Sequence, residues 1–421
     1  MKIAFTVCAL IAVLGMSVSA AINPAKYGAK GDGIHDDTAA IQKALDAAAT
    51  IKGTVQLNNG TFLITDSLKV GDNVLLQGDG PRWENLSTKI EVRKQGFPAI
   101  RLVGAVASVK GIQIQYPENT DMVKPIKYPA AIQLESINPS VEYVNFVLAW
   151  DGISTKPGGQ NAGQALFSNI TGFIHNCGIR LDGPADIVHV DHVHFFVAGA
   201  NPGDASYYYV KNRVAFEFGR VDGLFMNSCF MIFGEAFVRG LAKTGAGDPA
   251  HSLGYAITNC WVEYVRRGFD IEGILGMSVT NCHILITRPD GCGFRFVMPA
   301  IFYNLALSNV QVRYAAEGSG PAVIYAPTGI HPLTKLSISG SEFFTPGGSP
   351  AIMLGEKARN FICTGNYISG GPAIQIAKGA DFINITGNNI MGPIEDNTTA
   401  DASKNISANV TVDPAKLAVD L

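Results

Sequence analysis

Four charged residues recur at one position of a short motif, and their types suit acid–base chemistry. The motif reads glycine or alanine, apolar, any residue, apolar; in four central copies the third position is Arg180, Glu217, Asp270 or Arg295. Alternating apolar residues predict a strand whose third side chain faces solvent. Two carboxylates about 6.5–9.5 Å apart characterise inverting glycoside hydrolases, in which one protonates the leaving oxygen and the other activates water.

Glu217 and Asp270 are therefore the predicted catalytic pair, with Glu235 or Asp182 as the substitute member. The segment Ala236-Phe-Val238 fits the motif weakly and places Val238 between the two carboxylates in the outward column. The pair would then lie two coils, or about 9–10 Å, apart, which favours inversion over retention. Adjacent like charges would also raise one carboxyl pKa, as a general acid requires.

The residues around this pair suit the binding of an acidic sugar polymer. Arginines hold carboxylates through paired hydrogen bonds, and tyrosine rings offer sugars a flat apolar surface. An insertion near 198–213 leads into the strand of Glu217, and a second near 241–254 follows the strand of Val238, so the two would border a groove. The predicted substrate-binding residues are Arg180, Asp182, Arg267, Glu272, Arg295, Tyr207, Tyr208 and Tyr209.

Two other interpretations of the outward residues stay open. The column of Arg180, Glu217, Asp270 and Arg295 could be a ladder of ion pairs with a structural role only. A second polar face could form a rival groove; it carries Trp261, Glu263, His283, Gln311 and Arg313.

One histidine-rich stretch has the composition of a metal site, with His189, Asp191, His192 and His194. Strand alternation points His189 and Asp191 outward before a turn, places His192 at the bend, and points His194 outward after it. These side chains do not converge on one ion. We predict no metal site here.

A second short motif shows what positions these residues, because it recurs at steps of 22 to 36 residues. An apolar residue is followed by two polar or small residues and then a small inward one. Stacked β-coils with loop insertions produce a repeat of this kind. Its copies include Phe167-Ser-Asn-Ile170, Met226-Asn-Ser-Cys229, Ile257-Thr-Asn-Cys260, Val279-Thr-Asn-Cys282 and Leu307-Ser-Asn-Val310. The three cysteines then share one column, where we expect them to be small packing residues.

The composition fits a β-rich globular chain. Of 421 residues, 47% are apolar and 16% are charged, and 46 are glycine. Such a composition excludes a disordered chain. The formal net charge of −3 leaves no basic excess to neutralise phosphates, so nucleic acid is not an expected partner.

Residues 23–68 form a recognisable opening. Asp36 or Asp37 can cap a helix over 37–48 with one apolar face, and 55–64 reads as two short strands around a turn. This stretch resembles the N-terminal module of the pectate-lyase and polygalacturonase superfamily. The resemblance implies an all-β, right-handed parallel β-helix of about ten to twelve coils with a short capping helix. It leaves the chemistry open, because lyases, hydrolases, uronan epimerases and phage tailspikes use this module.

The catalytic pattern of polygalacturonases is matched only in part. Their Asn-Thr-Asp-Gly is represented by Asp151-Gly152 alone, and Asn176-Cys177 stands where the next coil would carry two aspartates. Gly-His-Gly does not occur in the sequence. The chain thus resembles the superfamily in scaffold and departs from the polygalacturonases in the catalytic triplet.

The predicted organisation is one folded unit with two terminal segments. Lys2, the apolar run 3–18 and the small residues Val18-Ser-Ala20 have the pattern of a cleaved signal peptide over 1–20. Residues 21–394 would form the β-helix with its two insertions. Residues 395–421, which are polar, would form a C-terminal tail.

The sequence as a whole predicts a secreted enzyme, extracellular or periplasmic, that cleaves a uronate-containing polysaccharide by inverting hydrolysis. A polysaccharide lyase on the same scaffold is the first alternative, and only that chemistry would call for Ca²⁺; no other cofactor is expected. A non-catalytic carbohydrate-binding or tailspike-like protein is the second. The expected partner is the polysaccharide, without nucleic acid and without membrane after signal cleavage, and the protein would be a monomer or homotrimer.

Overall fold

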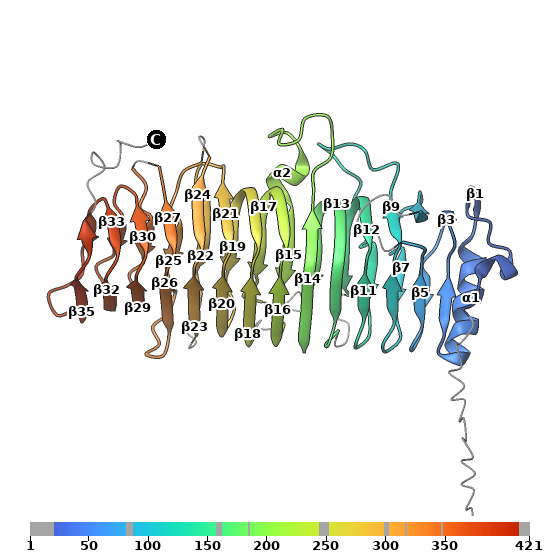
Figure 1. Ribbon diagram of the computed structural model, residues 1–421, viewed down its shortest axis with the longest axis horizontal. Coiled ribbons are helices and arrows are strands. Elements are labelled where there is room, and N and C mark those ends of the chain that lie inside the picture. Colours follow the sequence, from blue (N-terminus) through green and yellow to red (C-terminus); the bar gives the residue numbers. More distant parts are fainter. Residues whose placement is uncertain are drawn as a thin grey trace, which may run out of the picture.

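The computed structural model describes residues 21–80, 87–156, 162–183, 186–243, 252–298, 303–315, 318–346 and 348–411. Over these residues the chain winds into a right-handed parallel β-helix, as predicted (Figure 1). Each coil contributes strands to three parallel sheets that run the length of the molecule, and several long strands bend through a corner and serve two sheets. The predicted signal peptide lies outside the described residues.

The first sheet carries the candidate site, and its strands occupy thirteen successive coils of the described chain. They are β4 (Leu68–Val70), β7 (Ile100–Leu102), β10 (Ile132–Leu134), β12 (Asn145–Thr155), β13 (Leu166–Leu181), β15 (Val214–Phe218), β17 (Phe230–Gly240), β19 (Trp261–Ile271), β22 (Cys292–Phe296), β25 (Val323–Tyr325), β28 (Ile352–Leu354), β31 (Ile374–Ile376) and β34 (Ile394–Asp396).

The second sheet forms the side of each coil that follows the first sheet along the chain. Besides the first part of β13, it contains β2 (Thr54–Gln56), β5 (Leu75–Gln77), β8 (Ser108–Lys110), β11 (Ser140–Glu142), β14 (Ile187–Phe195), β16 (Gly223–Asn227), β18 (Gly254–Thr258), β20 (Gly276–Thr280), β23 (Asn304–Ser308), β26 (Lys335–Ser339), β29 (Arg359–Thr364), β32 (Asp381–Thr386) and β35 (Lys404–Ser407).

The third sheet closes the coil. It uses segments of β12, β13, β14, β17 and β19, together with β1 (Asp32–Asp36), β3 (Gly60–Ile64), β6 (Thr88–Val92), β9 (Gln113–Gln115), β21 (His283–Ile286), β24 (Gln311–Tyr314), β27 (Glu342–Phe344), β30 (Tyr367–Ser369), β33 (Asn389–Met391) and β36 (Val410–Thr411).

Two details of the predicted organisation are wrong. The stack has more coils than ten to twelve, because β4 and β34 extend the first sheet at its two ends. The polar tail does not begin at residue 395: residues 394–411 form β34, β35 and β36, which pair with the preceding coil. Asp396 and Lys404 occupy positions in register with the buried Ile376 and Ile383, and they pair with each other at 2.6 Å at this end of the stack.

The N-terminal cap matches the prediction. Helix α1 (Thr38–Ile51) lies over one end of the stack (Figure 1), with Ile41, Ala44, Leu45 and Ala48 buried against it. A 3-10 turn, η1 (Pro24–Tyr27), precedes it. Asp36 accepts a hydrogen bond from the Thr38 amide at 3.0 Å and so caps the first turn.

The interior consists of columns of like residues, because the strands are parallel and in register. Phe216, Val238, Phe269 and Phe294 form one such column, in which the rings of Phe269 and Phe294 stack with centroids 4.9 Å apart. Phe237, one residue out of this register, packs edge-on against Phe216 and Phe269 at 5.3 and 5.9 Å. Cys229, Cys260 and Cys282 are buried free thiols, as expected of packing residues. No helix of the described residues has the length and apolarity needed to cross a membrane.

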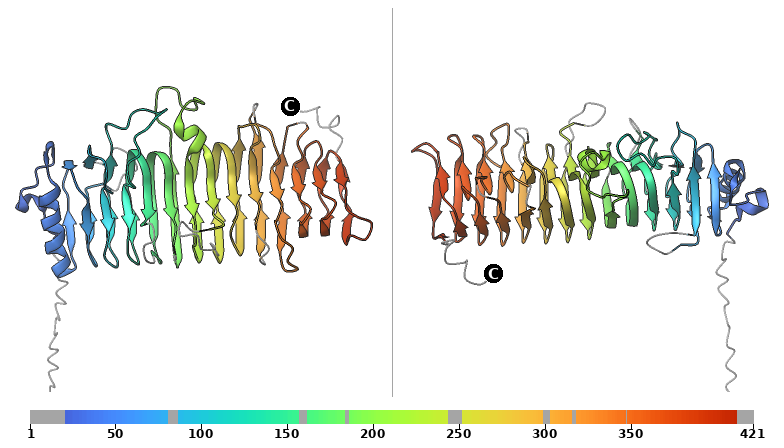
Figure 2. Two further views of the ribbon diagram at one scale, coloured as in Figure 1. Left: turned by 180° about the vertical axis from the view of Figure 1, so that it is seen from behind. Right: turned by 90° about the horizontal axis from the view of Figure 1, so that it is seen from above.

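A buried arginine fastens the insertion near 198–213 to the stack. The insertion contains α2 (Tyr208–Asn212), which lies over the middle of the stack (Figure 2). Arg213 follows it, is fully buried, and donates to the carbonyls of Phe196 at 2.7 Å and Phe233 at 2.8 Å, and to that of Ile232. Its guanidinium also lies over the ring of Tyr209, 5.0 Å from the centroid. These bonds supply donors to backbone carbonyls at the corner where the chain turns from the third sheet into the first.

Replacing Arg213 with methionine should lower the free energy of unfolding by about 3–5 kcal/mol, because buried carbonyls would lose their donors. The measurement is chemical denaturation followed by circular dichroism. Arg220→Met is the control, since Arg220 is exposed and pairs with nearby Asp222; its change should stay within about 0.5 kcal/mol. Equal effects of the two substitutions would contradict the role of Arg213.

Candidate active site

The outward column of the first sheet contains a charge that the sequence pattern misplaced. Arg239, and not Val238, pairs in register with Glu217 on one side and Asp270 on the other. Val238 points inward and is fully buried. The predicted alignment slipped by one residue because Phe237 occupies the position that alanine or glycine holds in the neighbouring coils. The central column therefore reads Arg180, Glu217, Arg239, Asp270, Arg295.

Positive and negative side chains alternate along this column, which we call the ladder, and its ion pairs form two groups, one around Glu217 and one around Asp270. Glu217 accepts from Arg180 Nε at 2.7 Å and from Arg239 Nη1 at 3.3 Å. Asp270 accepts from Arg295 Nη1 at 2.5 Å and from Arg267. The like-charge contact that was expected between Glu217 and Asp270 does not form, because Arg239 lies between them. Each carboxylate has a guanidinium on both of its oxygens.

Asp151 extends the ladder by one member that the sequence analysis left without a role. Its carboxylate accepts hydrogen bonds from Arg180 Nη1 at 2.8 Å, Asn176 Nδ2 at 2.7 Å and the Cys177 amide at 3.0 Å. Burial raises the pKa of Asp151 in spite of Arg180 and these donors. Arg180 thus contacts two carboxyl groups: the buried one of Asp151, whose pKa is raised, and that of Glu217. The one signal in the sequence was Asp151-Gly152 at the start of a motif strand.

Aromatic side chains border Asp151 on the side of the α2 insertion. The Tyr208 hydroxyl donates to Asn176 Oδ1 at 3.2 Å, and its ring lies 4.9 Å from that of Trp150. Tyr207 is half-buried beside Tyr209, with ring centroids 5.8 Å apart. Of the three tyrosines predicted to bind sugar, Tyr208 is the one in contact with this cluster.

The prediction for Tyr209 is wrong, because its ring is fully buried against Phe173 at 5.0 Å and its hydroxyl donates to the Ala198 carbonyl. Successive residues of a helix point about 100° apart, so three tyrosines in a row cannot share one face.

The remaining predicted residues form a second row of pairs beside the ladder. Glu235 pairs with Arg266 at 2.9 Å, and Arg266 pairs with Asp290 at 2.5 Å. Glu272 pairs with Arg295 at 3.2 Å. The Asp182 amide donates to Thr155 Oγ1 at 2.8 Å, which places Asp182 just past the end of the strand that carries Arg180.

The rival polar face lies on the third sheet. Trp261 and His283 stack there with centroids 4.2 Å apart, and the Trp261 indole donates to Glu263. His189 stacks on Phe225, and His194 bonds the Ser228 carbonyl, so the two rings are engaged separately. Within the described ranges, no three His, Cys, Asp or Glu side chains come close enough together to hold a metal ion.

Comparisons with known proteins agree with this architecture. Residues 21–104 match the family model described as "Rhamnogalacturonase A/epimerase, pectate lyase-like". The chain is 40% identical over 60 residues to the non-secreted LysM effector LysM19 of Penicillium expansum, covering 14% of this chain and 5% of that protein. It is 48% identical over 52 residues to a probable glucan endo-1,3-beta-glucosidase of Arthroderma benhamiae, covering 12% and 6%. The matches thus span only a small part of these relatives.

Solved structures share the fold over most of the chain. The A-module of mannuronan C-5 epimerase AlgE6 from Azotobacter vinelandii has a TM-score of 0.51 at 15% identity, with 93% of this chain and 99% of that one covered. The tailspike of E. coli bacteriophage HK620, solved with a pentasaccharide, has a TM-score of 0.56 at 10% identity, with 89% and 72% covered. The chain has the pectate-lyase-like β-helix fold.

The ladder predicts an energetic coupling between Arg239 and Glu217. In a double-mutant cycle of Arg239→Gln and Glu217→Gln, we expect a coupling of about 0.5–2 kcal/mol in the free energy of unfolding, because both side chains are partly buried and in contact. The matched control is the exposed pair Arg313–Glu342, for which about 0.2–1 kcal/mol is expected. Strictly additive effects at Arg239 and Glu217 would show that the pair contributes nothing.

Proposed function

We propose that the protein is a secreted enzyme that cleaves a uronate-containing polysaccharide on the outward face of the first sheet. The fold supports a carbohydrate-active protein, since structures that share it include a mannuronan epimerase module and a tailspike bound to a pentasaccharide. The description of the matching family model names a rhamnogalacturonase, a polysaccharide-cleaving activity. Export rests on the sequence of residues 1–20.

The observation that carries the proposal is the carboxyl pair that shares Arg180. A general acid must hold its proton at the working pH, and burial raises the pKa of Asp151 in that direction. Glu217, ion-paired with Arg180 and Arg239, has the charge that a general base needs. A raised pKa on one of two carboxyl groups at the same site marks that group as the candidate acid.

The spacing of this pair is compatible with inversion. Asp151 pairs in register with Cys177 and, through it, with Val214, three residues before Glu217, so the strand spacing alone does not set the distance between the two carboxyl groups. They contact Nη1 and Nε of the same guanidinium at 2.8 and 2.7 Å, which places their nearest oxygens at most about 8 Å apart. Inverting enzymes hold their carboxyls about 6.5–9.5 Å apart to admit water, whereas retaining enzymes need about 5 Å. Asp270 is the poorer candidate for the base, because its side chain is 5% exposed, against 14% for that of Glu217.

The roles follow from the geometry. Asp151 would donate its proton to the glycosidic oxygen as the bond to the anomeric carbon breaks. Glu217 would take a proton from the water that attacks that carbon from the opposite face, so one bond forms, one breaks, and the configuration inverts. Arg180 would orient both carboxyl groups, and Trp150 and Tyr208 would flank the sugar on the α2 side.

Asp151→Asn and Glu217→Gln should each reduce turnover by about 10²–10⁴-fold, the usual cost of losing a general acid or base. Asp270→Asn should retain most of the activity, and Glu342→Gln, on the third sheet, is the matched control. The assay measures new reducing ends on pectin-type, alginate-type and neutral glucan substrates.

Ultraviolet absorbance of the products separates the alternatives, because β-elimination creates a new double bond and hydrolysis does not. Products that absorb would establish a lyase. Ligand binding without cleavage of any substrate would establish a binding protein. Full activity of both the Asp151 and Glu217 variants would overturn the site.

The pH profile should fall on its alkaline side as Asp151 loses its proton, since only the protonated carboxyl can act as the acid. Arg180 stabilises the ionised carboxylate and thus lowers the pKa of Asp151. Arg180→Met should therefore move the alkaline limb of kcat/KM to higher pH. An unmoved limb would mean that a different group carries the proton.

A further inference from the structure

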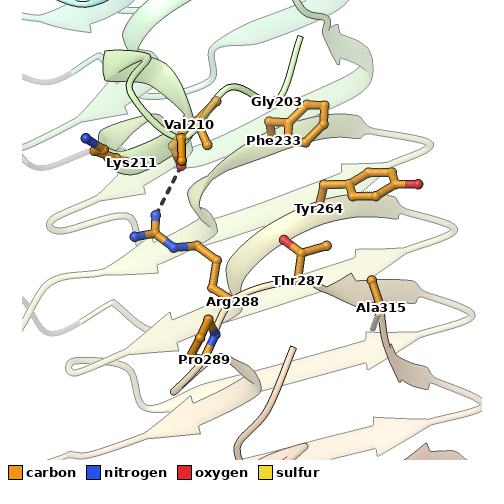
Figure 3. A pocket seen from close by; sticks show the side chains of 10 residues that line it. Gly203, Val210, Lys211, Phe233, Tyr264, Thr287, Arg288, Pro289 and Ala315 are labelled. Carbon is orange, nitrogen blue, oxygen red and sulfur yellow. Dashed lines mark hydrogen bonds between the residues drawn. The ribbon is translucent and has the colours of Figure 1, made fainter. Parts of the chain in front are cut away.

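A cavity of about 510 Å³ lies beside α2, at the corner where the third sheet turns into the first (Figure 3). It is separate from the ladder, and none of the ladder residues lines it. Its wall comes from the α2 insertion on one side and from the coils of β17, β19 and β21 on the other. The residues that line it are Gly203, Ala205, Val210, Lys211, Phe233, Tyr264, Thr287, Arg288, Pro289 and Ala315.

Two aromatic residues of this wall have a backbone conformation that bulky side chains rarely adopt. Phe233 and Tyr264 occupy equivalent corner positions of successive coils with φ of 58° and 55°. At the corner between the second and third sheets, the left-handed position is mostly asparagine or glycine, as at Asn259, Asn281 and Gly340, with Tyr143 and His192 among the exceptions. Asparagine and glycine tolerate that conformation at low cost, whereas an aromatic residue does not. Strain of this kind concentrates at binding sites.

The strained corner holds two rings in a fixed stack. The rings of Phe233 and Tyr264 have centroids 4.9 Å apart and planes inclined by 27°. The ring of Phe233 packs closely on Gly203, and its carbonyl is held by Arg213. Tyr264 is 37% exposed, so one ring of the stack is open to the cavity and to solvent. A rigid, half-open aromatic face of this type suits the apolar face of a sugar ring.

Two cationic side chains lie across from the rings, as Figure 3 shows. Arg288 donates to the Val210 carbonyl at 3.3 Å, and among the described residues neither Arg288 nor Lys211 has a carboxylate within ion-pair distance. The neighbouring arginines differ in this respect: Arg180, Arg239, Arg266, Arg267 and Arg295 all contact carboxylates. Asp290 and Asp204 interact electrostatically with Arg288 and Lys211, respectively, but without ion-pair contact among the described residues, so both cations can still pair with an anionic ligand.

We propose that this cavity binds one uronate unit of a polysaccharide, with the sugar ring on Tyr264 and the sugar carboxylate on Arg288 and Lys211. Guanidinium and carboxylate pair through two parallel hydrogen bonds, which gives the site preference for an acidic over a neutral sugar. The inference rests on the proposed function only in taking a polysaccharide as the ligand. The site itself holds no acid or base for cleavage and acts as an anchor.

Calorimetric titration tests the proposal in the full chain carrying Asp151→Asn, so that the probes stay intact. The probes are trigalacturonate, trimannuronate and, as the neutral match, cellotriose. At least one acidic trimer should bind ten times more tightly than cellotriose. Arg288→Gln and Lys211→Gln should each weaken the acidic trimer about tenfold or more, and the effect should shrink at high salt.

The ring contribution is tested at Tyr264. Tyr264→Asn removes the ring and suits the left-handed backbone, so the fold is retained, and binding of the acidic trimer should fall about tenfold. Tyr264→Phe should bind as the parent does. Arg220→Gln, an exposed arginine away from the cavity, is the matched control and should change nothing.

The outcomes separate this proposal from the proposed function. Affinity lost in the cavity variants, together with a parent that cleaves no polysaccharide, supports the anchor and overturns the enzyme. Cleavage that depends on Asp151, together with unchanged affinity in the cavity variants, supports the enzyme and overturns the anchor. Equal affinity for cellotriose and the acidic trimers, or no binding of either acidic trimer, overturns the anchor.

Discussion

The in-register stacking of parallel strands is the constraint on which the rest of this molecule depends. Each residue lies about 4.8 Å from its equivalents in the coils before and after, so whatever one coil presents, its neighbours must accommodate. Inside the stack this favours columns of apolar residues, such as Phe216, Val238, Phe269 and Phe294. Outside it, like charges in register would repel. The alternation from Arg180 to Arg295 is the arrangement that the spacing permits.

The same constraint decides how much could be predicted from the sequence. The repeat of small inward residues and the glycine or alanine motif were enough for the fold, the cap and the face on which charges gather. The alignment of the motif failed at β17, because Phe237 stands where the neighbouring coils have alanine or glycine. The predicted outward position was therefore Val238 and not Arg239. That one-residue slip changed the predicted site, because it hid Arg239, the cation between Glu217 and Asp270. Strands with period two give no warning of such a slip when both faces hold apolar residues.

Other properties of the site depend on contacts between coils, which no local pattern encodes. Asp151 is buried because Asn176, Cys177 and Arg180 from the next coil close over it. Tyr209 was predicted to bind sugar because it follows Tyr207 and Tyr208 in a loop, yet a short helix turns its ring into the core. Burial and helix phase are outcomes of packing. They explain why residue types were easier to predict than residue roles.

A row of two ion pairs runs from the cavity wall onto β17, the strand that also carries Arg239 of the ladder. Asp290, next to Pro289 of the cavity wall, pairs with Arg266, which pairs with Glu235 on β17. Glu217 on β15 and the coil that carries Arg288 are three strand spacings apart, roughly 14 Å along the axis. A single sugar cannot reach both places, whereas a chain of several units can. In the proposed enzyme, an anchor at that distance would align the polymer along the stack and add affinity for long substrates without taking part in the proton transfers at Asp151 and Glu217.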